Sequence, residues 1–293
     1  MQRVAFLSAS CMVLQDASKR EDAWEHDLEF EPLQRACAER GIELVTRIWD
    51  DPELVIDDFD AFVVGTTWDY QERVDEFLAM LGRVAERKPL FNPLEVVRWN
   101  LDKRYLRELD ARGVRVVPTL WAEDAGDATI LDAFDHFGTE RLVVKPVVGA
   151  GAWRQVLVSR DAPLPPREQR PPAQAMVQPF LESVTTEGEY SFLFFDGEFS
   201  HCALKRPAAG DYRVQSLYGG REVMHEPSEH EIAACKLVLA AARERLLYAR
   251  VDMVRYADEL ALIELEVVEP YLYPEQGPQL GERFAAALER MLG

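Results

Sequence analysis

Short apolar runs alternate with amphipathic stretches along the N-terminal third of the chain. Four of these runs have the length of buried strands, at residues 4–9, 43–48, 61–65 and 89–92. Apolar residues with helical spacing lie between them, at residues 28–40 and 77–84, and Gly41 follows the first of these as a helix stop. Strands that alternate with helices predict a parallel sheet flanked by helices, in a lobe that ends near Asn92 and Pro93.

The pattern after this lobe favours antiparallel strands and a few separate helices. Between residues 98 and 173 it predicts an amphipathic helix from Arg98 stopped by Gly113, a strand that ends at Pro118, and a proline-rich surface connection over residues 161–173. Further along it predicts a short strand at residues 176–181, a hairpin that turns at Asp196 and Gly197, and helices at residues 229–245 and 279–292.

A second hairpin is predicted near the C-terminus. Two β-rich runs, at residues 248–256 and 260–268, are separated by residues 257–259. This spacing suits a hairpin with a three-residue loop. The register of such a hairpin decides which side chains share a face, because a slip of one residue turns every side chain to the other side.

Three carboxylates share one face of this second hairpin. With a three-residue loop, Asp252 is directly opposite Glu264, and Glu266 follows on the same face. Opposed carboxylates repel unless a proton or a cation lies between them. Oxygen ligands of this kind favour Mg²⁺ or Mn²⁺, so the residues predict a divalent metal site. The alternative is an edge hairpin whose acids lie in solvent.

Two lysines are placed to bind anions. Lys145 lies near the end of an apolar strand within residues 141–153, and the small-residue loop after it contains Gly149 and Gly151. An ammonium group and free backbone N–H groups around one concavity suit nucleotide phosphates, and the alternative is a hairpin turn whose lysine extends to the surface. Lys103 lies in the first turn of a predicted helix, where a cation opposes the helix dipole and needs another reason to be present.

Other basic residues gather between the predicted strands of the C-terminal half. Lys205, Arg206 and Arg213 are close together in the sequence and are suited to bind carboxylate or phosphate. Charge balance for nearby acids is the alternative explanation. His201 lies in a strand-like stretch, where a packed core histidine is expected rather than a catalytic base.

Two segments of the first lobe are candidates for substrate contact. Residues 10–27 and 66–70 follow predicted strands, and loops at the ends of strands in parallel sheets tend to bind ligands. For residues 66–70 the alternative is a helix N-terminus capped by Thr67 or Asp69. Neither a GxGxxG fingerprint after the first strand nor a GxxxxGK[ST] loop is present in the sequence, so a dinucleotide fold and a P-loop are not indicated.

Composition and charge restrict the class of partner. The 293 residues include 52 acids and 33 bases, for a formal charge of −19, which argues against general binding to nucleic acid or to an anionic membrane. The four cysteines are widely spaced without a CxxC pair, so reduced thiols are expected. No apolar run has the length of a signal peptide or a membrane span, which predicts a cytoplasmic protein.

From Asn100 to Glu269 the order of motifs resembles the ATP-grasp superfamily. The matching segments are, in order, WNLDKRYL, GVRVVPT, LVVKPVVGAGA, VQPFL, GEYSFLFFDGE, GDYRVQ with a following GG, ARVDMV and LIELEVVEP. The branch that contains glutathione synthetases and ribosomal-protein glutamate ligases is most similar. Within this branch, VGTTWDY, FNPLEVVRWNLDKRYL and SHCALKRPAAGDYRV resemble the D-cycloserine synthetase group.

This resemblance implies a fold and a division into lobes. The expected fold class is α/β, with an α+β C-terminal part: an ATP-grasp fold preceded by an N-terminal Rossmann-like lobe. Residues 1–95 would form the pre-grasp lobe, residues 96–175 the small grasp subdomain, and residues 176–293 the large subdomain with the metal site. ATP would lie between the two grasp subdomains.

The resemblance also implies residues that bind the cofactors ATP and Mg²⁺. The nucleotide-binding set consists of Lys103, Lys145, Gly149, Ala150, Gly151, Gln178, Pro179, Phe180, Leu181, Glu182 and Glu189. In this set the lysines would bind phosphates, residues 149–152 would close over them, and residues 178–181 would present backbone groups to adenine. Asp252, Glu264 and Glu266 match the Mg²⁺ positions, although the superfamily commonly has Asn in place of Glu266.

The activity that the resemblance implies is phosphorylation of a carboxylate or carbonyl oxygen by ATP, followed by attack of an amine-type nucleophile. Arg213 matches an arginine that steadies the transferred phosphate, and Lys205 and Arg206 are the other catalytic candidates. The substrates would be a small-molecule carboxylate and amine, and a homodimer is the expected assembly. Two alternatives are ligation of an amino acid to a peptide or protein, and a non-catalytic nucleotide-binding protein.

Overall fold

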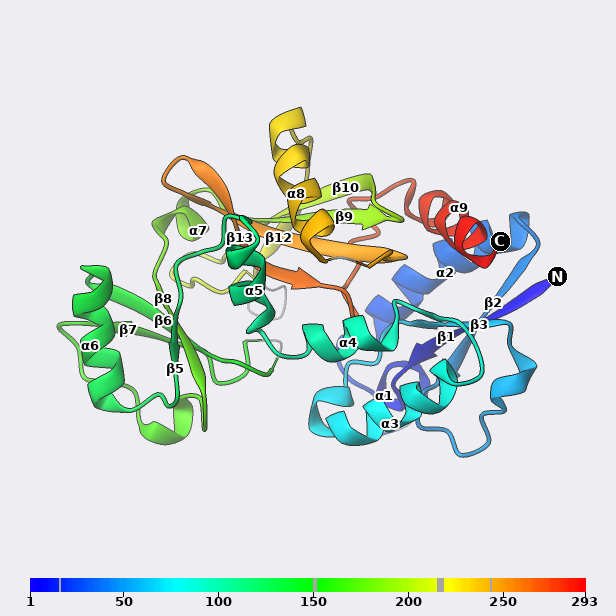
Figure 1. Ribbon diagram of the computed structural model, residues 1–293, viewed down its shortest axis with the longest axis horizontal. Coiled ribbons are helices and arrows are strands. Elements are labelled where there is room, and N and C mark those ends of the chain that lie inside the picture. The colour runs from blue at the N-terminus through cyan, green and yellow to red at the C-terminus, as the bar shows by residue number, and fades with distance from the viewer. Residues whose placement is uncertain (16, 150–151, 215–218, 243) are drawn as a thin grey trace.

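The structure is a computed structural model that describes residues 1–15, 17–149, 152–214, 219–242 and 244–293. Strands in these ranges form three sheets, each at the centre of one lobe (Figure 1). The N-terminal lobe lies beside the large sheet of β9 to β13, and the small lobe with α6 lies at the far end of the molecule. The site therefore forms where three separately built sheets approach one another.

The first sheet is parallel and belongs to the N-terminal lobe. Its strand order is β2-β1-β3-β4, with β1 at Gln2–Ser8, β2 at Ile42–Ile48, β3 at Ala61–Val64 and β4 at Leu90–Phe91. The helices of this lobe are α1 (Ser10–Val13), α2 (Trp24–Glu39) and α3 (Val74–Ala85), with short 3-10 turns at Ile56–Asp58 and Tyr70–Glu72. The predicted alternation of strand and helix is confirmed, although α2 begins one turn earlier than the apolar spacing indicates.

The second sheet is antiparallel and small. It has the order β5-β8-β6-β7, with β5 at Leu120–Ala122, β6 at Arg141–Pro146, β7 at Val156–Ser159 and β8 at Ala175–Pro179. Helix α6 (Asp127–Phe137) packs on it through Ile130 and Phe134, and a 3-10 turn at Arg167–Gln169 lies in the proline-rich connection. The boundary predicted between residues 175 and 176 falls inside β8, because β8 pairs with β6 rather than with the strands that follow.

Helices α4 (Leu94–Asn100) and α5 (Tyr105–Ala111) lead from the first lobe into this small lobe. The sequence pattern predicted one amphipathic helix here, with Lys103 in its first turn. The structure instead has two short helices, and Lys103 lies in the turn between them. No strand precedes Pro118 in this described stretch; Val116 makes a single bridge to Leu262.

The third sheet is the largest and is antiparallel. Its order is β11-β10-β9-β12-β13, with β9 at Glu189–Phe195, β10 at Glu198–Arg206, β11 at Arg221–His225, β12 at Tyr248–Tyr256 and β13 at Glu259–Glu266. Helix α8 (Glu229–Ala242) and helix α5 cover one face, where Val251 and Met253 are buried. A short helix, α7 (Glu182–Thr186), connects β8 to β9. Because side chains alternate along a strand, Arg250 and Asp252 point to the opposite face.

The C-terminal helix α9 (Leu280–Leu292) packs mainly against α2 of the first lobe and also contacts β9 and β10 of the large sheet (Figure 1). Phe284 lies in one apolar cluster with Phe30 of α2 and Phe195 of β9. Asn92 adds a polar connection, since its amide donates to the carbonyls of Tyr248 and Val267 at 2.9 and 2.8 Å. The first lobe and the large sheet therefore share one core.

The hairpin of β12 and β13 differs from the prediction in its loop. Tyr256 pairs with Glu259, so the loop has two residues, Ala257 and Asp258, both with positive φ as in a type I′ turn. A bulge at Ile263 then shifts the register, and Asp252 pairs with Glu264. The predicted opposition of Asp252 and Glu264 is confirmed, but the bulge produces it and the loop length does not.

Candidate active site

A cavity of about 650 Å³ lies where the three lobes meet. The polar residues of its wall include Arg20, Glu25, Lys103, Lys145, Gln178, Glu189, Lys205, Arg213, Glu222, Arg250, Asp252, Glu264, Glu266 and Glu269. Bases and acids are mixed on this wall, so a ligand that carries several negative charges meets cations and candidate metal ligands together.

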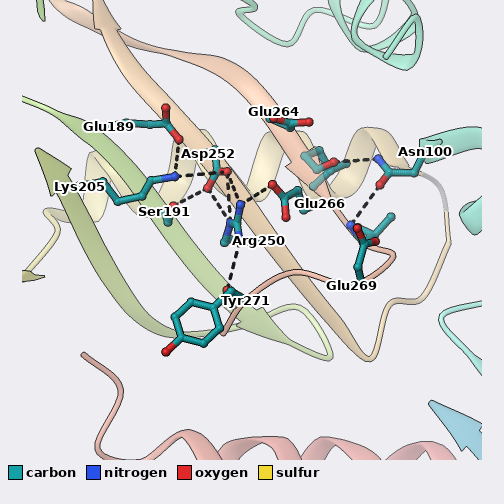
Figure 2. A network of polar contacts seen from close by, with 12 residues as sticks. Asn100, Glu189, Ser191, Lys205, Arg250, Asp252, Glu264, Glu266, Glu269 and Tyr271 are labelled. Atoms are coloured by element: carbon teal, nitrogen blue, oxygen red, sulfur yellow. Dashed lines mark hydrogen bonds and ion pairs between the residues drawn. The ribbon is translucent and has the colours of Figure 1, made fainter. Parts of the chain in front are cut away.

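Asp252 lies at the centre of a network of charges on the cavity face of the large sheet (Figure 2). Its side chain is buried, and it accepts hydrogen bonds from Ser191 and from Arg250, whose Nη2 is 2.9 Å from Oδ2. Lys205 Nζ lies 3.7 Å from the same oxygen and also pairs with Glu189. Burial opposes the ionisation of Asp252, but attraction to Arg250 and Lys205 holds its pKa below the usual value.

Arg250 bridges the acids of both hairpin strands. It contacts Asp252, forms an ion pair with Glu266, and donates to the Tyr271 carbonyl at 3.2 Å (Figure 2). Burial raises the pKa of Glu266 to about 8, because attraction to Arg250 only partly offsets desolvation and the repulsion by nearby carboxylates. On this side of the cavity the acids Glu189, Asp252 and Glu266 outnumber the bases Lys205 and Arg250.

Lys103 and Lys145 differ in how they are held. Lys103 Nζ lies 2.6 Å from Glu264 Oε1 and donates to the Gly149 carbonyl at 2.8 Å. Lys145 reaches the cavity from the end of β6, and no acid or hydrogen-bond acceptor pairs with it in the part of the chain that the structure describes. Burial lowers the pKa of Lys145, with Glu264 acting in the opposite direction. The alternative, in which this lysine extends to the surface, is wrong, because Lys145 lines the cavity.

The other end of the cavity is apolar. Residues Gln178, Pro179, Phe180 and Leu181 line it together with Ile263, as predicted for a strand beside adenine. Gln178 is buried and donates to Thr119 Oγ1 at 2.9 Å. Gly149 lines the wall beside Trp153, whereas Ala150 and Gly151 lie outside the described residues.

Comparison with known proteins places this arrangement in a family. A family model for the N-terminal domain of D-cycloserine synthetase DcsG matches residues 4–92. The cycloserine biosynthesis protein DcsG of Streptomyces lavendulae is 33% identical over 291 residues, which covers 91% of this chain and 94% of that protein. This chain belongs to the D-cycloserine synthetase family.

Solved structures agree with this family membership. The crystal structure of D-cycloserine synthetase DcsG has a TM-score of 0.86 at 29% identity, and the match covers 99% of this chain and 100% of that one. The ATP-grasp ligase PsnB, solved with a minimal precursor, Mg and ADP, shares the fold with a TM-score of 0.65 at 16% identity, covering 98% of this chain and 96% of that one. The predicted ATP-grasp fold is confirmed, and the chain is an ATP-grasp ligase, an enzyme class that uses ATP to form amide-type bonds.

Two residues that the sequence analysis predicted for the active site lie outside the cavity. Arg206 is exposed and donates to the Glu187 carbonyl at 3.1 Å, because it follows Lys205 on β10 and therefore points to the other face. Glu182 pairs with Arg141 on the surface, at the start of α7. Of the two glutamates in the predicted nucleotide-binding set, only Glu189 lines the cavity.

Arg250 is one member of this site that the sequence analysis missed. The available signal was a base two residues before Asp252, since residues i and i+2 of a strand share a face. Arg213 was predicted and does line the cavity, where it forms an ion pair with Asp211 at 2.7 Å.

The segment at residues 66–70 contacts the cavity rather than capping a helix. Trp68 lines the cavity and donates from its indole to the Glu269 carbonyl at 3.2 Å. Asp69 accepts from Trp49 and Arg73, and it makes no side-chain cap to the 3-10 turn that follows. His201 is buried as expected, with Nε2 2.8 Å from the Leu272 carbonyl, and it is absent from the cavity wall.

Proposed function

We propose that this chain uses ATP and Mg²⁺ to phosphorylate a carboxylate or carbonyl oxygen of a small molecule, which an amine-type nucleophile then attacks to form an amide-type bond. The transferred group is the γ-phosphoryl of ATP, ADP leaves, and the nucleophile then displaces phosphate. Similarity to D-cycloserine synthetase over nearly the whole chain supports closure of a ring within one molecule.

The cations of the cavity support this reaction through charge. Lys145 is the single observation that carries the proposal, because it extends into the cavity without an anionic partner among the described side chains. Lys103, Lys205 and Arg250 lie on the same wall and are paired with acids. Phosphoryl transfer depends mainly on positioning and on neutralising charge around the transferred group, which these four cations supply.

The carboxylates suit Mg²⁺ in donor type and in charge. In the described ranges no three acid, histidine or cysteine side chains enclose a common point where a metal ion fits, because Glu264 is drawn to Lys103 and Glu266 to Arg250. Asp252, Glu264 and Glu266 would hold the ion once those two bases turn to phosphate oxygens. Bound Mg²⁺ would neutralise phosphate charge and orient the transferred group.

The proposal also includes the setting of the reaction. No helix within the described residues is long and apolar enough to cross a membrane. We place the enzyme in the cytoplasm and propose that it acts on small molecules as a homodimer, without nucleic acid or membrane partners, in agreement with its charge of −19.

ADP release tests the proposal directly. Wild type should release ADP only when Mg²⁺, ATP and an acceptor are all present, and Glu264→Gln should lower kcat at least about a hundredfold because a metal ligand and a negative charge are lost. The variant keeps the shape of the side chain, so its thermal midpoint without ligands should stay close to that of wild type. Full activity in Glu264→Gln would remove the metal role, and absence of Mg²⁺-dependent ATP turnover with every carboxylate and amine pair would remove the ligase proposal.

A further inference from the structure

A short irregular segment after β13 forms part of the cavity wall. Tyr271 and Tyr273 both line the cavity, and their ring centroids are 5.0 Å apart. Leu272 lies between them and packs into the core that the first lobe and the large sheet share. We name these three residues the tyrosine strap. Since the strap belongs to no helix or strand, other contacts must fix its position.

Three buried side chains hold the backbone of the tyrosine strap. The N–H of Leu272 donates to Glu29 Oε2 of α2 at 2.9 Å, and its carbonyl lies 2.8 Å from His201 Nε2 of β10. Arg250 of β12 donates to the Tyr271 carbonyl at 3.2 Å (Figure 2). These contacts come from both the first lobe and the large sheet, so the strap is fixed from two sides.

Tyr273 has an unusual backbone conformation within the tyrosine strap. Its φ is 49°, in the left-handed region that glycine adopts freely and that residues with a bulky side chain rarely adopt. Such residues persist where the surrounding structure holds them, and they gather at functional sites. The contacts to Leu272 supply that hold. An aromatic residue in this conformation suggests that its side chain is used.

The ring of Tyr273 lies beside two cations of the site. Its centroid is 5.9 Å from Lys205 Nζ and 5.5 Å from Arg250 Cζ. Cations are attracted to the face of an aromatic ring, most strongly where water is excluded. Both bases also lie close to Asp252, at the centre of the charge network. Tyr273 is therefore held next to the cations that the proposed reaction uses.

The hydroxyl of Tyr273 is available to a ligand. The residue is only 5% exposed, and within the described residues its hydroxyl makes no hydrogen bond. It is not among the fully enclosed polar atoms that lack a partner in these ranges, so it opens to the cavity. Burial raises the pKa of Tyr273 although Lys205 and Arg250 act in the opposite direction, so the hydroxyl is protonated at neutral pH. A buried tyrosine hydroxyl usually has a partner, which indicates that a ligand supplies one.

We propose that the Tyr273 hydroxyl is a catalytic hydrogen-bond donor to the carbonyl oxygen of the phosphorylated carboxyl group. This inference rests on the ligase function proposed above and adds the group that stabilises its tetrahedral intermediate. The nitrogen of the nucleophile bonds to the carbonyl carbon, and an electron pair moves onto the oxygen that Tyr273 contacts. The C=O bond then forms again as phosphate leaves with the proton of the nitrogen. Tyr273 keeps its own proton, and a donor already in place needs no rearrangement during the step.

Two probes that differ in the carbonyl oxygen test the inference. D-cycloserine carries this oxygen on its ring, and isoxazolidin-4-amine is the same ring with CH₂ in its place. Calorimetry at pH 7.5 with Mg²⁺ and ADP measures the binding of each. Tyr273→Phe should bind D-cycloserine about tenfold more weakly than wild type does, because one hydrogen bond is lost, and should bind isoxazolidin-4-amine as wild type does. The control Tyr256→Phe, at the end of β12 and outside the cavity wall, should bind both probes as wild type does.

The variant also separates a role of the hydroxyl from a role of the ring. Tyr273→Phe keeps the ring beside Lys205 and Arg250, so its affinity for Mg²⁺-ADP and its thermal midpoint should equal those of wild type. Equal affinity of wild type and Tyr273→Phe for D-cycloserine would overturn the inference, and so would parallel losses of D-cycloserine and Mg²⁺-ADP binding. A wild type that binds Mg²⁺-ADP but not D-cycloserine removes the assignment of Tyr273 and leaves the ligase proposal standing. A wild type that binds no nucleotide removes both.

Discussion

Replacement of Lys145 by alanine measures what the unpartnered cation of the cavity contributes to nucleotide binding. A hydrogen bond from a charged group contributes about 1.5–3 kcal/mol. Loss of about 2 kcal/mol weakens binding roughly 30-fold. Mg²⁺-ATP at about 100 times the wild-type Kd stabilises the wild type by about 2.7 kcal/mol, and the same concentration stabilises the variant by only about 0.9 kcal/mol.

Thermal unfolding with and without Mg²⁺-ATP detects this difference. With about 2 °C per kcal/mol for a chain of this length, the midpoint should rise by about 5 °C in wild type and by about 2 °C in Lys145→Ala. Without ligand the two proteins should unfold at similar temperatures, because Lys145 makes no ion pair within the described residues that the variant could lose. Lys236→Ala, at an exposed position of α8, is the matched control and should respond as wild type does. Equal ligand-induced shifts in wild type and Lys145→Ala would refute the assignment of Lys145 to phosphate.

Three further changes test the site and the core. Arg250→Lys keeps the positive charge but loses the guanidinium group that contacts both Asp252 and Glu266. The kcat for ADP release should therefore fall at least about tenfold, with little change in the thermal midpoint. An unchanged kcat would exclude a catalytic role for Arg250. In Gly281→Ala the new Cβ would lie 2.3 Å from the Pro32 carbonyl oxygen, so the free energy of unfolding in urea should fall by about 1–3 kcal/mol. Gly82→Ala, which has open space around the new Cβ, should raise the free energy of unfolding by about 0.5–1 kcal/mol. Equal effects of the two substitutions would contradict the close packing of α2 and α9. Burial lowers the pKa of His201 from 6.5 to about 4, so between these pH values the unfolded chain binds more protons than the folded one, and the free energy of unfolding falls by up to about 3 kcal/mol as the pH drops. In His201→Gln the urea midpoint should therefore depend less on pH between 6.5 and 4. The same pH dependence in the variant and in wild type would assign the loss to other groups.

The sequence predicted the chemistry of the site better than its geometry. Residue types at strand ends identified Lys145 and the carboxylates of the second hairpin, because charged residues inside apolar runs need a reason to be there. The two-residue loop was not predicted, since Ala257 and Asp258 are not the glycine or asparagine that usually mark a turn with positive φ. The bulge was not predicted either, because a bulge in β13 leaves no compositional signal.

Contacts between segments far apart in the chain could not be predicted from the sequence either. Arg206 was predicted for the site from its neighbourhood along the chain and Glu182 from the family resemblance, but the face of β10 and the position of α7 direct them elsewhere. The apolar face of α9 indicated that the helix packs, without indicating that α2 is its partner. Tyr273 gave no signal of its own, because a tyrosine beside apolar residues is ordinary in sequence and becomes unusual only when its backbone takes a positive φ next to two buried cations.

In the proposed nucleotide site, the bulge in β13 lets one strand contact both the apolar base and the charged phosphates. In a regular strand, neighbouring residues point to opposite faces, so an apolar residue and an acid next to each other cannot both reach one ligand. Here Ile263 and Glu264 both line the cavity, one at the apolar end beside Leu181 and the other among the charges. Deletion of Ile263 would make the pairing regular and leave Glu264 opposite Asp252, but it would remove the apolar side chain that lies beside Leu181. The ability of this strand to present Ile263 and Glu264 at one face thus depends on one extra residue, which a substitution at position 263 keeps and a deletion there removes.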